Sequence, residues 1–86
     1  MIKDDIIPHE AVPVDISVTD FDCTTVFVSS RYARRIFVGS KGTIYVKYFG
    51  YDVAIPYVKG NGTYLDGKIS TVVRSGTTAS DIVAET

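Results

Sequence analysis

The chain has 86 residues, of which 45% are hydrophobic and 22% are charged, and its formal net charge is -1. This length is enough for one domain only, since a second core would have too little chain to enclose it. The near-neutral charge argues against a nucleic-acid-binding protein, which needs several convergent cations to neutralise phosphates. The hydrophobic fraction excludes a disordered chain.

No segment approaches the roughly 20 apolar residues that a membrane helix needs. The first residues, Met-Ile-Lys-Asp-Asp-Ile-Ile-Pro, place acids where a signal peptide has its apolar run. The single cysteine, Cys23, excludes an intrachain disulfide. We therefore expect a soluble protein without an export signal or a membrane partner.

Residues 1–11 mix charges with isolated apolar residues, and Pro8 and Pro13 disfavour a helix here. One interpretation is a frayed terminus. The other is an extended arm that docks on a neighbouring subunit through its three isoleucines, Ile2, Ile6 and Ile7. We treat residues 1–11 as an extended N-terminal arm and residues 12–86 as a single β domain.

The densest strand signal spans residues 36–49, where two runs of β-branched and aromatic residues flank a Gly-Ser-Lys-Gly connection. A four-residue connection with glycines predicts a β-hairpin. Because both runs are densely apolar, we expect this hairpin near the middle of a sheet. The pairs Gly39/Gly42 and Gly60/Gly62 are expected to be turn glycines, since neither precedes a helix that could receive a phosphate.

Alternation of side chains predicts further strands at 12–19, 24–29, 53–58 and 69–74. Short strands are also expected at 63–65 and at 81–84; residues 79–85 could form one helical turn, but Ile82-Val83 favours a strand. In the strand at 12–19, the apolar face consists of Val12, Val14, Ile16 and Val18. Turns are expected at residues 19–22, 50–52, 59–62, 66–67 and 75–78. Pro56 cannot donate to a ladder, so its strand should lie at an edge or carry its proline at a non-bonded position. The sequence therefore predicts an all-β fold, a small antiparallel β-sandwich or barrel of six to eight short strands.

Few residues could carry catalysis. His9 lies in the arm and is expected to be a solvated surface side chain, and Cys23 is better explained as a small buried side chain than as a nucleophile. Asp20 and Asp22 are better explained as turn carboxylates than as calcium ligands or a glycosidase pair, because no closing glutamate or sugar cleft accompanies them. We therefore expect no enzyme, no catalytic residue, no cofactor and no metal site.

A basic cluster precedes the expected hairpin and consists of Arg31, Tyr32, Arg34 and Arg35. Three interpretations remain open: a solvated loop, a contact with another protein, or a contact with nucleic acid. Arginine and tyrosine are enriched at the anchors of protein interfaces. We therefore include these four residues among the candidate partner-interface positions, although we expect no nucleic-acid partner.

Aromatic residues supply the other candidate positions. In a strand over residues 43–49, Tyr45 and Phe49 share one face, and Tyr51 follows in the next turn. The opposite face is also apolar. Either both faces are covered within the domain, or one meets a partner. A carbohydrate-binding platform could use the same aromatic rings.

Four stretches carry a resemblance to a known family. They are Arg-Ile-Phe-Val-Gly at 35–39, Gly-Thr-Ile-Tyr-Val at 42–46, Gly-Thr-Tyr-Leu at 62–65, and Ile-Ser-Thr-Val-Val-Arg-Ser-Gly-Thr-Thr-Ala-Ser-Asp-Ile-Val-Ala at 69–84. They resemble the small virion proteins of tailed bacteriophages and gene transfer agents that are described as head-spike base or capsid-associated proteins. The family closes on Gly-Thr-Thr-Ala-Thr-Asp-Ile-Val-Ala, which residues 76–84 match except at Ser80.

The resemblance implies a non-enzymatic structural protein of the virion, assembled in the host cytoplasm. The implied role is capsid decoration, cement or head-spike base, with the major capsid protein or other virion proteins as partners. We expect a homo-oligomer, a trimer or larger, because many modest contacts together hold such a protein on a particle. The alternatives are a tail or baseplate structural component and a glycan-binding module of a host-recognition device.

Overall fold

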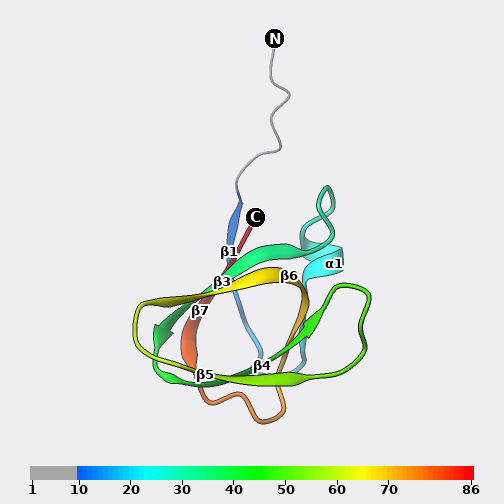
Figure 1. Ribbon diagram of the computed structural model, residues 1–86. Coiled ribbons are helices and arrows are strands. Elements are labelled where there is room, and N and C mark those ends of the chain that lie inside the picture. The colour runs from blue at the N-terminus through cyan, green and yellow to red at the C-terminus, as the bar shows by residue number, and fades with distance from the viewer. Residues whose placement is uncertain (1–9) are drawn as a thin grey trace.

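The computed structural model describes residues 10–86, which form one seven-stranded antiparallel sheet and one short helix (Figure 1). In chain order the elements are β1 (Ala11–Pro13), β2 (Phe21–Asp22), α1 (Cys23–Val26), β3 (Ala33–Ser40), β4 (Gly42–Tyr48), β5 (Ile55–Lys59), β6 (Thr63–Val73) and β7 (Ser80–Glu85). The order across the sheet is β1-β7-β3-β6-β4-β5, and β2 pairs with β6 off this path. The prediction of a small antiparallel all-β fold is confirmed.

The sheet curls around a single core. The segment before β7 returns to β4, where the backbone nitrogens of Thr78 and Ala79 donate to the carbonyl oxygen of Thr43 at 2.8 and 3.1 Å. In Figure 1, β7, β3, β6 and β4 surround a common interior. The side chains that fill it without any exposure include Phe27, Ile36, Val38, Ile44, Val46, Ile69 and Val72. Within residues 10–86, no helix has the length and apolar composition to cross a membrane.

The predicted hairpin over residues 36–49 is wrong. β3 and β4 are joined by Lys41 alone and do not pair, since β3 lies between β7 and β6 whereas β4 lies between β6 and β5. Their glycines allow a close backbone approach instead of a turn. A Cβ on Gly39 would lie 2.7 Å from the carbonyl oxygen of Asp81, and one on Gly42 would lie 2.6 Å from the nitrogen of Ala79. The chain entering β7 therefore passes directly against this bend.

Residues 23–26 form the helical turn α1, where alternation predicted a strand over 24–29. Asp22 is its N-cap: the carboxylate accepts hydrogen bonds from the backbone nitrogen of Thr24 at 3.0 Å and from its hydroxyl at 2.6 Å. Such local bonds offer the backbone an alternative to a strand ladder. Cys23 is fully buried, as predicted, and so is Phe27 just beyond the helix.

The first strand is shorter than predicted. β1 ends at Pro13, and Asp15 then accepts hydrogen bonds from the backbone nitrogen and the hydroxyl of Ser17 at 3.0 and 2.7 Å. These two bonds lower the pKa of the Asp15 carboxyl below its usual value. After this turn the chain no longer continues as a strand. The placement of Val18 on a buried apolar face is therefore wrong, since its side chain is 84% exposed.

β6 runs without interruption through residues 66–67, where a turn was predicted. The register shifts between its pairs with β3 and again between its pairs with β4, so the strand bends by bulges and stays hydrogen-bonded. A Cβ on Gly67 would lie 2.7 Å from Cε1 of Tyr48. The absence of a side chain at Gly67 therefore allows the Tyr48 ring to pack against the bent strand β6.

Two local predictions about β5 and its following turn are confirmed. β5 pairs only with β4, so Pro56 lies in an edge strand. Residues 61–62 form a turn, in which Gly62 has φ +66° and the side-chain oxygen of Asn61 accepts a hydrogen bond from the nitrogen of Lys41 at 2.7 Å. Both features depend on neighbours in the chain, which is why the sequence pattern identifies them.

Candidate interaction surfaces

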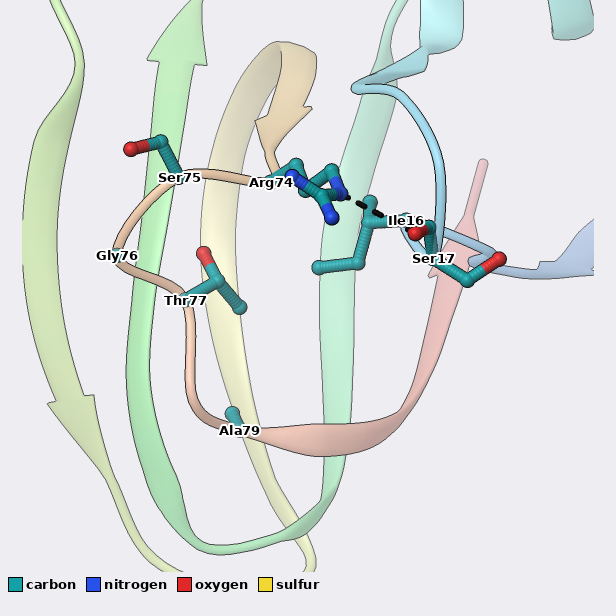
Figure 2. A pocket seen from close by; sticks show the side chains of 7 residues that line it. All are labelled: Ile16, Ser17, Arg74, Ser75, Gly76, Thr77 and Ala79. Carbon is teal, nitrogen blue, oxygen red and sulfur yellow. Dashed lines mark hydrogen bonds between the residues drawn. The ribbon is translucent and has the colours of Figure 1, made fainter.

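The closing motif at residues 76–84 binds the loop before β7 to β4 (Figure 2). A Cβ on Gly76 would lie 2.7 Å from Cε1 of Tyr45. The hydroxyl of Thr77 accepts a hydrogen bond from the nitrogen of Tyr45 at 2.9 Å and donates to the carbonyl oxygen of Val73 at 2.6 Å. The hydroxyl of Thr78 accepts from the nitrogen of Thr43 at 2.9 Å. The Gly-Thr-Thr segment at residues 76–78 therefore fastens this loop to β4, and we call it the structural staple.

The second half of the motif fixes β7 beside β3. Asp81 has φ +54°, and its carboxylate accepts a hydrogen bond from the hydroxyl of Ser40 at 2.6 Å. Ala79, Ile82 and Ala84 are buried in the core. The motif thus has a packing or hydrogen-bonding role at nearly every position, and Tyr45, a candidate interface residue, has its ring against the motif's glycine within the domain.

Beside this staple lies an open depression of about 540 Å³, lined by Ile16, Ser17, Arg74, Ser75, Gly76, Thr77 and Ala79 (Figure 2). Arg74 is held by hydrogen bonds within the domain. Its Nε donates to the carbonyl oxygen of Ser17 at 3.2 Å, and its backbone nitrogen donates to the Asp20 carboxylate at 2.8 Å. Asp20 and Asp22 therefore act as local hydrogen-bond acceptors. No group of three potential metal ligands occurs within residues 10–86.

The structure separates the four residues of the basic cluster. Arg35 extends over the ring of Tyr64, with its guanidinium carbon 4.4 Å from the ring centroid, and its Nε lies 2.9 Å from a carboxylate oxygen of Glu85. Arg31 and Arg34 are exposed, and Arg31 has φ +66°. Tyr32 is half-buried. Arg35 is thus held within the domain, whereas Arg31 and Arg34 face solvent.

Tyr32 and Arg34 line a second depression together with Gly67 and Lys68, with a volume of about 380 Å³. We call it the basic depression. The ammonium nitrogen of Lys68 lies 5.6 Å from the centroid of the Tyr32 ring, and the Phe49 ring packs on the same tyrosine at a centroid distance of 5.4 Å. Two cations and the Tyr32 ring therefore line one opening, and Phe49 packs against that ring.

A row of apolar side chains that the sequence analysis missed crosses the outer face of the sheet. Pro13, Val83, Phe37 and Tyr64 are successive partners across β1, β7, β3 and β6. Directly paired residues point to the same face. This row faces outward, because the buried neighbours in β3, β6 and β7 point to the other face: Ile36, Val38, Leu65, Ile82 and Ala84. The Phe37 and Tyr64 rings lie 5.3 Å apart. Only the strand register, which joins distant segments, brings these residues together.

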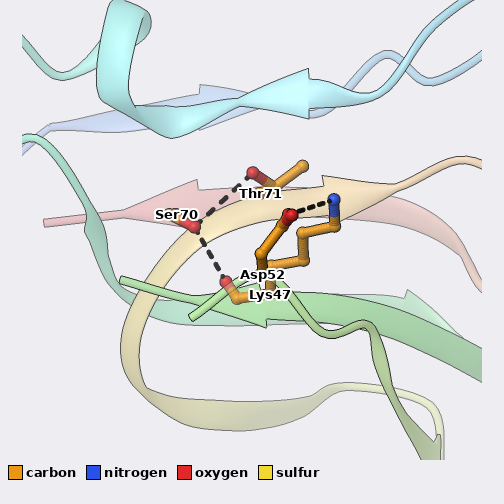
Figure 3. Close-up of polar contacts among 4 residues, drawn as sticks. All are labelled: Lys47, Asp52, Ser70 and Thr71. Atoms are coloured by element: carbon orange, nitrogen blue, oxygen red, sulfur yellow. Dashed lines mark hydrogen bonds and ion pairs between the residues drawn. The ribbon is translucent and has the colours of Figure 1, made fainter. Parts of the chain in front are cut away.

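A further apolar surface follows the free edge of the sheet. The exposed fractions are 73% for Tyr51, 66% for Val53 and 84% for Val58. The loop that carries the first two is tied to β4 by Lys47, whose Nζ lies 3.0 Å from an Asp52 carboxylate oxygen (Figure 3). This ion pair is exposed and contributes about 0–1 kcal/mol. We call these side chains the apolar edge; Phe49, 40% exposed, adjoins them in sequence.

Of the remaining candidates, Ile2, Ile6, Ile7 and His9 lie outside the described residues. The candidates that the structure brings together are Tyr32, Arg34 and Phe49, with Tyr51 following two residues after Phe49. Comparison with protein-family models finds no match. No curated protein matches the chain, and no solved structure does.

The buried Cys23 and the half-buried Tyr48 limit the stability of the fold at alkaline pH. Burial raises the pKa of the Cys23 thiol from 9.0 to about 12. Burial, followed by the hydrogen bond with the Tyr57 hydroxyl at 2.6 Å, raises the pKa of Tyr48 from 10.0 to about 12. At neutral pH the thiol is protonated and inaccessible, which is the state of an inert cysteine.

We expect the free energy of unfolding to fall as pH rises from about 9 towards 12. In this window the unfolded chain loses protons that Cys23 and Tyr48 keep in the folded state, so deprotonation favours unfolding. Urea midpoints at about pH 8 and about pH 10.5 measure the effect. The Cys23→Ala variant should show a weaker pH dependence, and equal midpoints at both values in the parent chain would contradict the assignment.

Proposed function

We propose that this chain is a non-enzymatic structural protein of a phage virion that binds the capsid surface as a homo-oligomer, in the role of a decoration, cement or head-spike base protein. The resemblance at residues 76–84 suggests the virion. The observation that carries the interaction role is the apolar edge, where Tyr51, Val53 and Val58 are each at least 66% exposed. Several large, exposed apolar side chains along one edge favour a site of protein association.

The structural staple supports transfer of the fold from the resembled family. Each glycine or threonine in Gly-Thr-Thr meets a specific neighbour, either the Tyr45 ring or a backbone nitrogen of β4. A motif held by such contacts is tied to one arrangement of strands, so a shared motif favours a shared fold. Two separate surfaces are then present: the apolar edge, and the row of apolar side chains on the outer face of the sheet formed by Pro13, Val83, Phe37 and Tyr64. Two surfaces suit a protein that contacts both its own copies and a capsid.

The chemistry of the edge suggests side-chain contacts in place of a continued sheet. The backbone groups of Thr43 and Tyr45 form hydrogen bonds with the loop before β7, on the side of β4 away from β5. Their partners in β5 are Val58 and Pro56, so the backbone groups of these two residues point away from β4, toward the free edge of the sheet. Pro56 has no N–H to offer there. A proline at this position limits strand addition, which leaves the exposed apolar side chains as the contact.

Light scattering after size-exclusion chromatography should show a trimer or a larger closed oligomer. Val53→Asp combined with Val58→Asp should weaken self-association by at least about tenfold, because both would place a charge in a desolvated contact. Val28→Asp is the matched control, since Val28 is 80% exposed but lies near α1. A strict monomer at high concentration, or an equal loss in the control, would count against the proposal.

The same variants test the virion assignment. Mass spectrometry of purified particles should detect the parent chain at a fixed copy number relative to the major capsid protein. The double variant should be depleted from particles, whereas Val28→Asp should be retained. A chain absent from the particles while it forms oligomers in solution would contradict the virion role and leave self-association intact.

A further inference from the structure

The basic depression offers cations that the described part of the chain does not neutralise. Within residues 10–86, neither Arg34 nor Lys68 has an ion-pair partner. Asp66, two residues before Lys68 and paired with Arg35 across β3 and β6, forms no ion pair with Arg34 or Lys68, and Glu85 forms one with Arg35. The opening therefore combines positive charge with the ring of Tyr32, against which Phe49 packs, and this suits a ligand that carries carboxylates next to apolar groups.

The chain enters the described structure close to this opening. The nitrogen of Thr86 donates to the carbonyl oxygen of Glu10 at 2.9 Å, and Glu85 pairs with Ala11 on one side and Arg35 on the other. Two strand spacings, about 10 Å, therefore separate Glu10 from the start of β3. Residues 1–9 join the fold at the end of the sheet that carries Arg34.

The sequence of that segment matches the chemistry of the depression. Residues 4–7 read Asp-Asp-Ile-Ile, two carboxylates followed by two apolar side chains. Arg34 and Lys68 can pair with the carboxylates, while the rings of Tyr32 and Phe49 can contact the isoleucines. We propose that residues 1–9 of one copy bind the basic depression of a neighbouring copy, which fastens the oligomer by its arms.

The length of residues 1–9 suits binding to a neighbouring copy. Proline disfavours helical backbone in the residue before it, and a segment of nine residues would span up to about 30 Å when extended. That reach is about three times the roughly 10 Å between Glu10 and the start of β3 in the same chain, so the segment is long enough to extend to a neighbouring copy. This inference rests on the proposed homo-oligomer and adds its fastening contact.

A spin label tests the contact in the full chain. Lys3→Cys accepts the label selectively, because the native Cys23 is fully buried. Labelled chains at natural isotope abundance are mixed with unlabelled ¹⁵N chains and refolded together. The amide signals of Tyr32, Arg34 and Lys68 should weaken strongly, whereas those of Asn61 and Gly62, beyond the far end of β3, should not. Weakening only when label and isotope share a chain would overturn the proposal.

Charge reversal supplies the second measurement. Arg34→Glu with Lys68→Glu in the ¹⁵N chain should reduce the signal loss by about threefold or more, and Asp4→Lys with Asp5→Lys in the labelled chain should restore it. Lys41→Glu with Lys59→Glu, at the other end of the sheet, is the control and should change nothing. A monomer in light scattering defeats the proposed function itself. If the protein is an oligomer but the amide signals of Tyr32, Arg34 and Lys68 are not weakened by the label, only the proposed contact of residues 1–9 with the basic depression is contradicted.

Discussion

Replacing Phe27 with alanine should lower the free energy of unfolding by about 3–5 kcal/mol. The ring has no solvent exposure and follows directly after α1, so its removal leaves a cavity beneath the helical turn. A domain of 86 residues has a total stability of about 4–13 kcal/mol. The substitution therefore removes a large share of the stability, which urea denaturation followed by circular dichroism would measure.

The neighbouring residue provides the control for this variant. Val28 is 80% exposed, so Val28→Ala should change the stability by no more than about 0.5 kcal/mol. If Phe27→Ala costs less than about 1 kcal/mol, the ring does not anchor the helical turn to the core. Loss of folding in Phe27→Ala alone would agree with the expected size, and Phe27→Leu would then give a measurable intermediate value.

Replacing Gly42 with alanine should lower the free energy of unfolding by about 2–4 kcal/mol. The new Cβ would lie 2.6 Å from the nitrogen and 2.8 Å from the Cα of Ala79, and both atoms belong to backbone that cannot move aside without disturbing β7. The effect should appear as a lower urea midpoint with an unchanged slope, since the surface exposed on unfolding stays the same.

Gly60→Ala is the matched control for this substitution. Its Cβ would meet only the side chain of Thr63, at 3.8 Å, and its backbone is not in a glycine-specific conformation. We expect a change within about 0.5 kcal/mol. Similar losses in both variants would mean that the approach of Ala79 to the bend at Gly42 does not explain why a glycine is present there.

The fold class follows from local patterns. Strands are predicted by the β-branched pair Ile82-Val83 and by the β-branched and aromatic runs of 36–38 and 43–46, and all three predictions are confirmed. Pro56 identifies its own edge strand because a missing N–H is a property of that residue alone. Asp22 shows the limit: its capping bond to Thr24 competes with strand propensity, and only the surrounding packing decides which prevails.

The candidate surfaces were less accessible to sequence reasoning. Tyr32 and Arg34 were recognised as residue types suited to contacts, but their position beside Lys68 in one opening depends on the bend of β6. The outer row of Phe37 and Tyr64 was missed because each residue lies in a different strand, and the register that pairs them is set by tertiary contacts.

By itself, the sequence determined an all-β chain of short strands, because side-chain alternation, turn residues and proline act over a few neighbouring positions. Only the tertiary structure decided how those strands pair. Gly39 and Gly42 have the local signature of a hairpin, yet the chain uses the space above them for the backbone of Ala79 and Asp81. A contact across 37 or more residues leaves no trace in local periodicity, so the partner of each strand, and each surface built from several strands, appears only in the folded molecule.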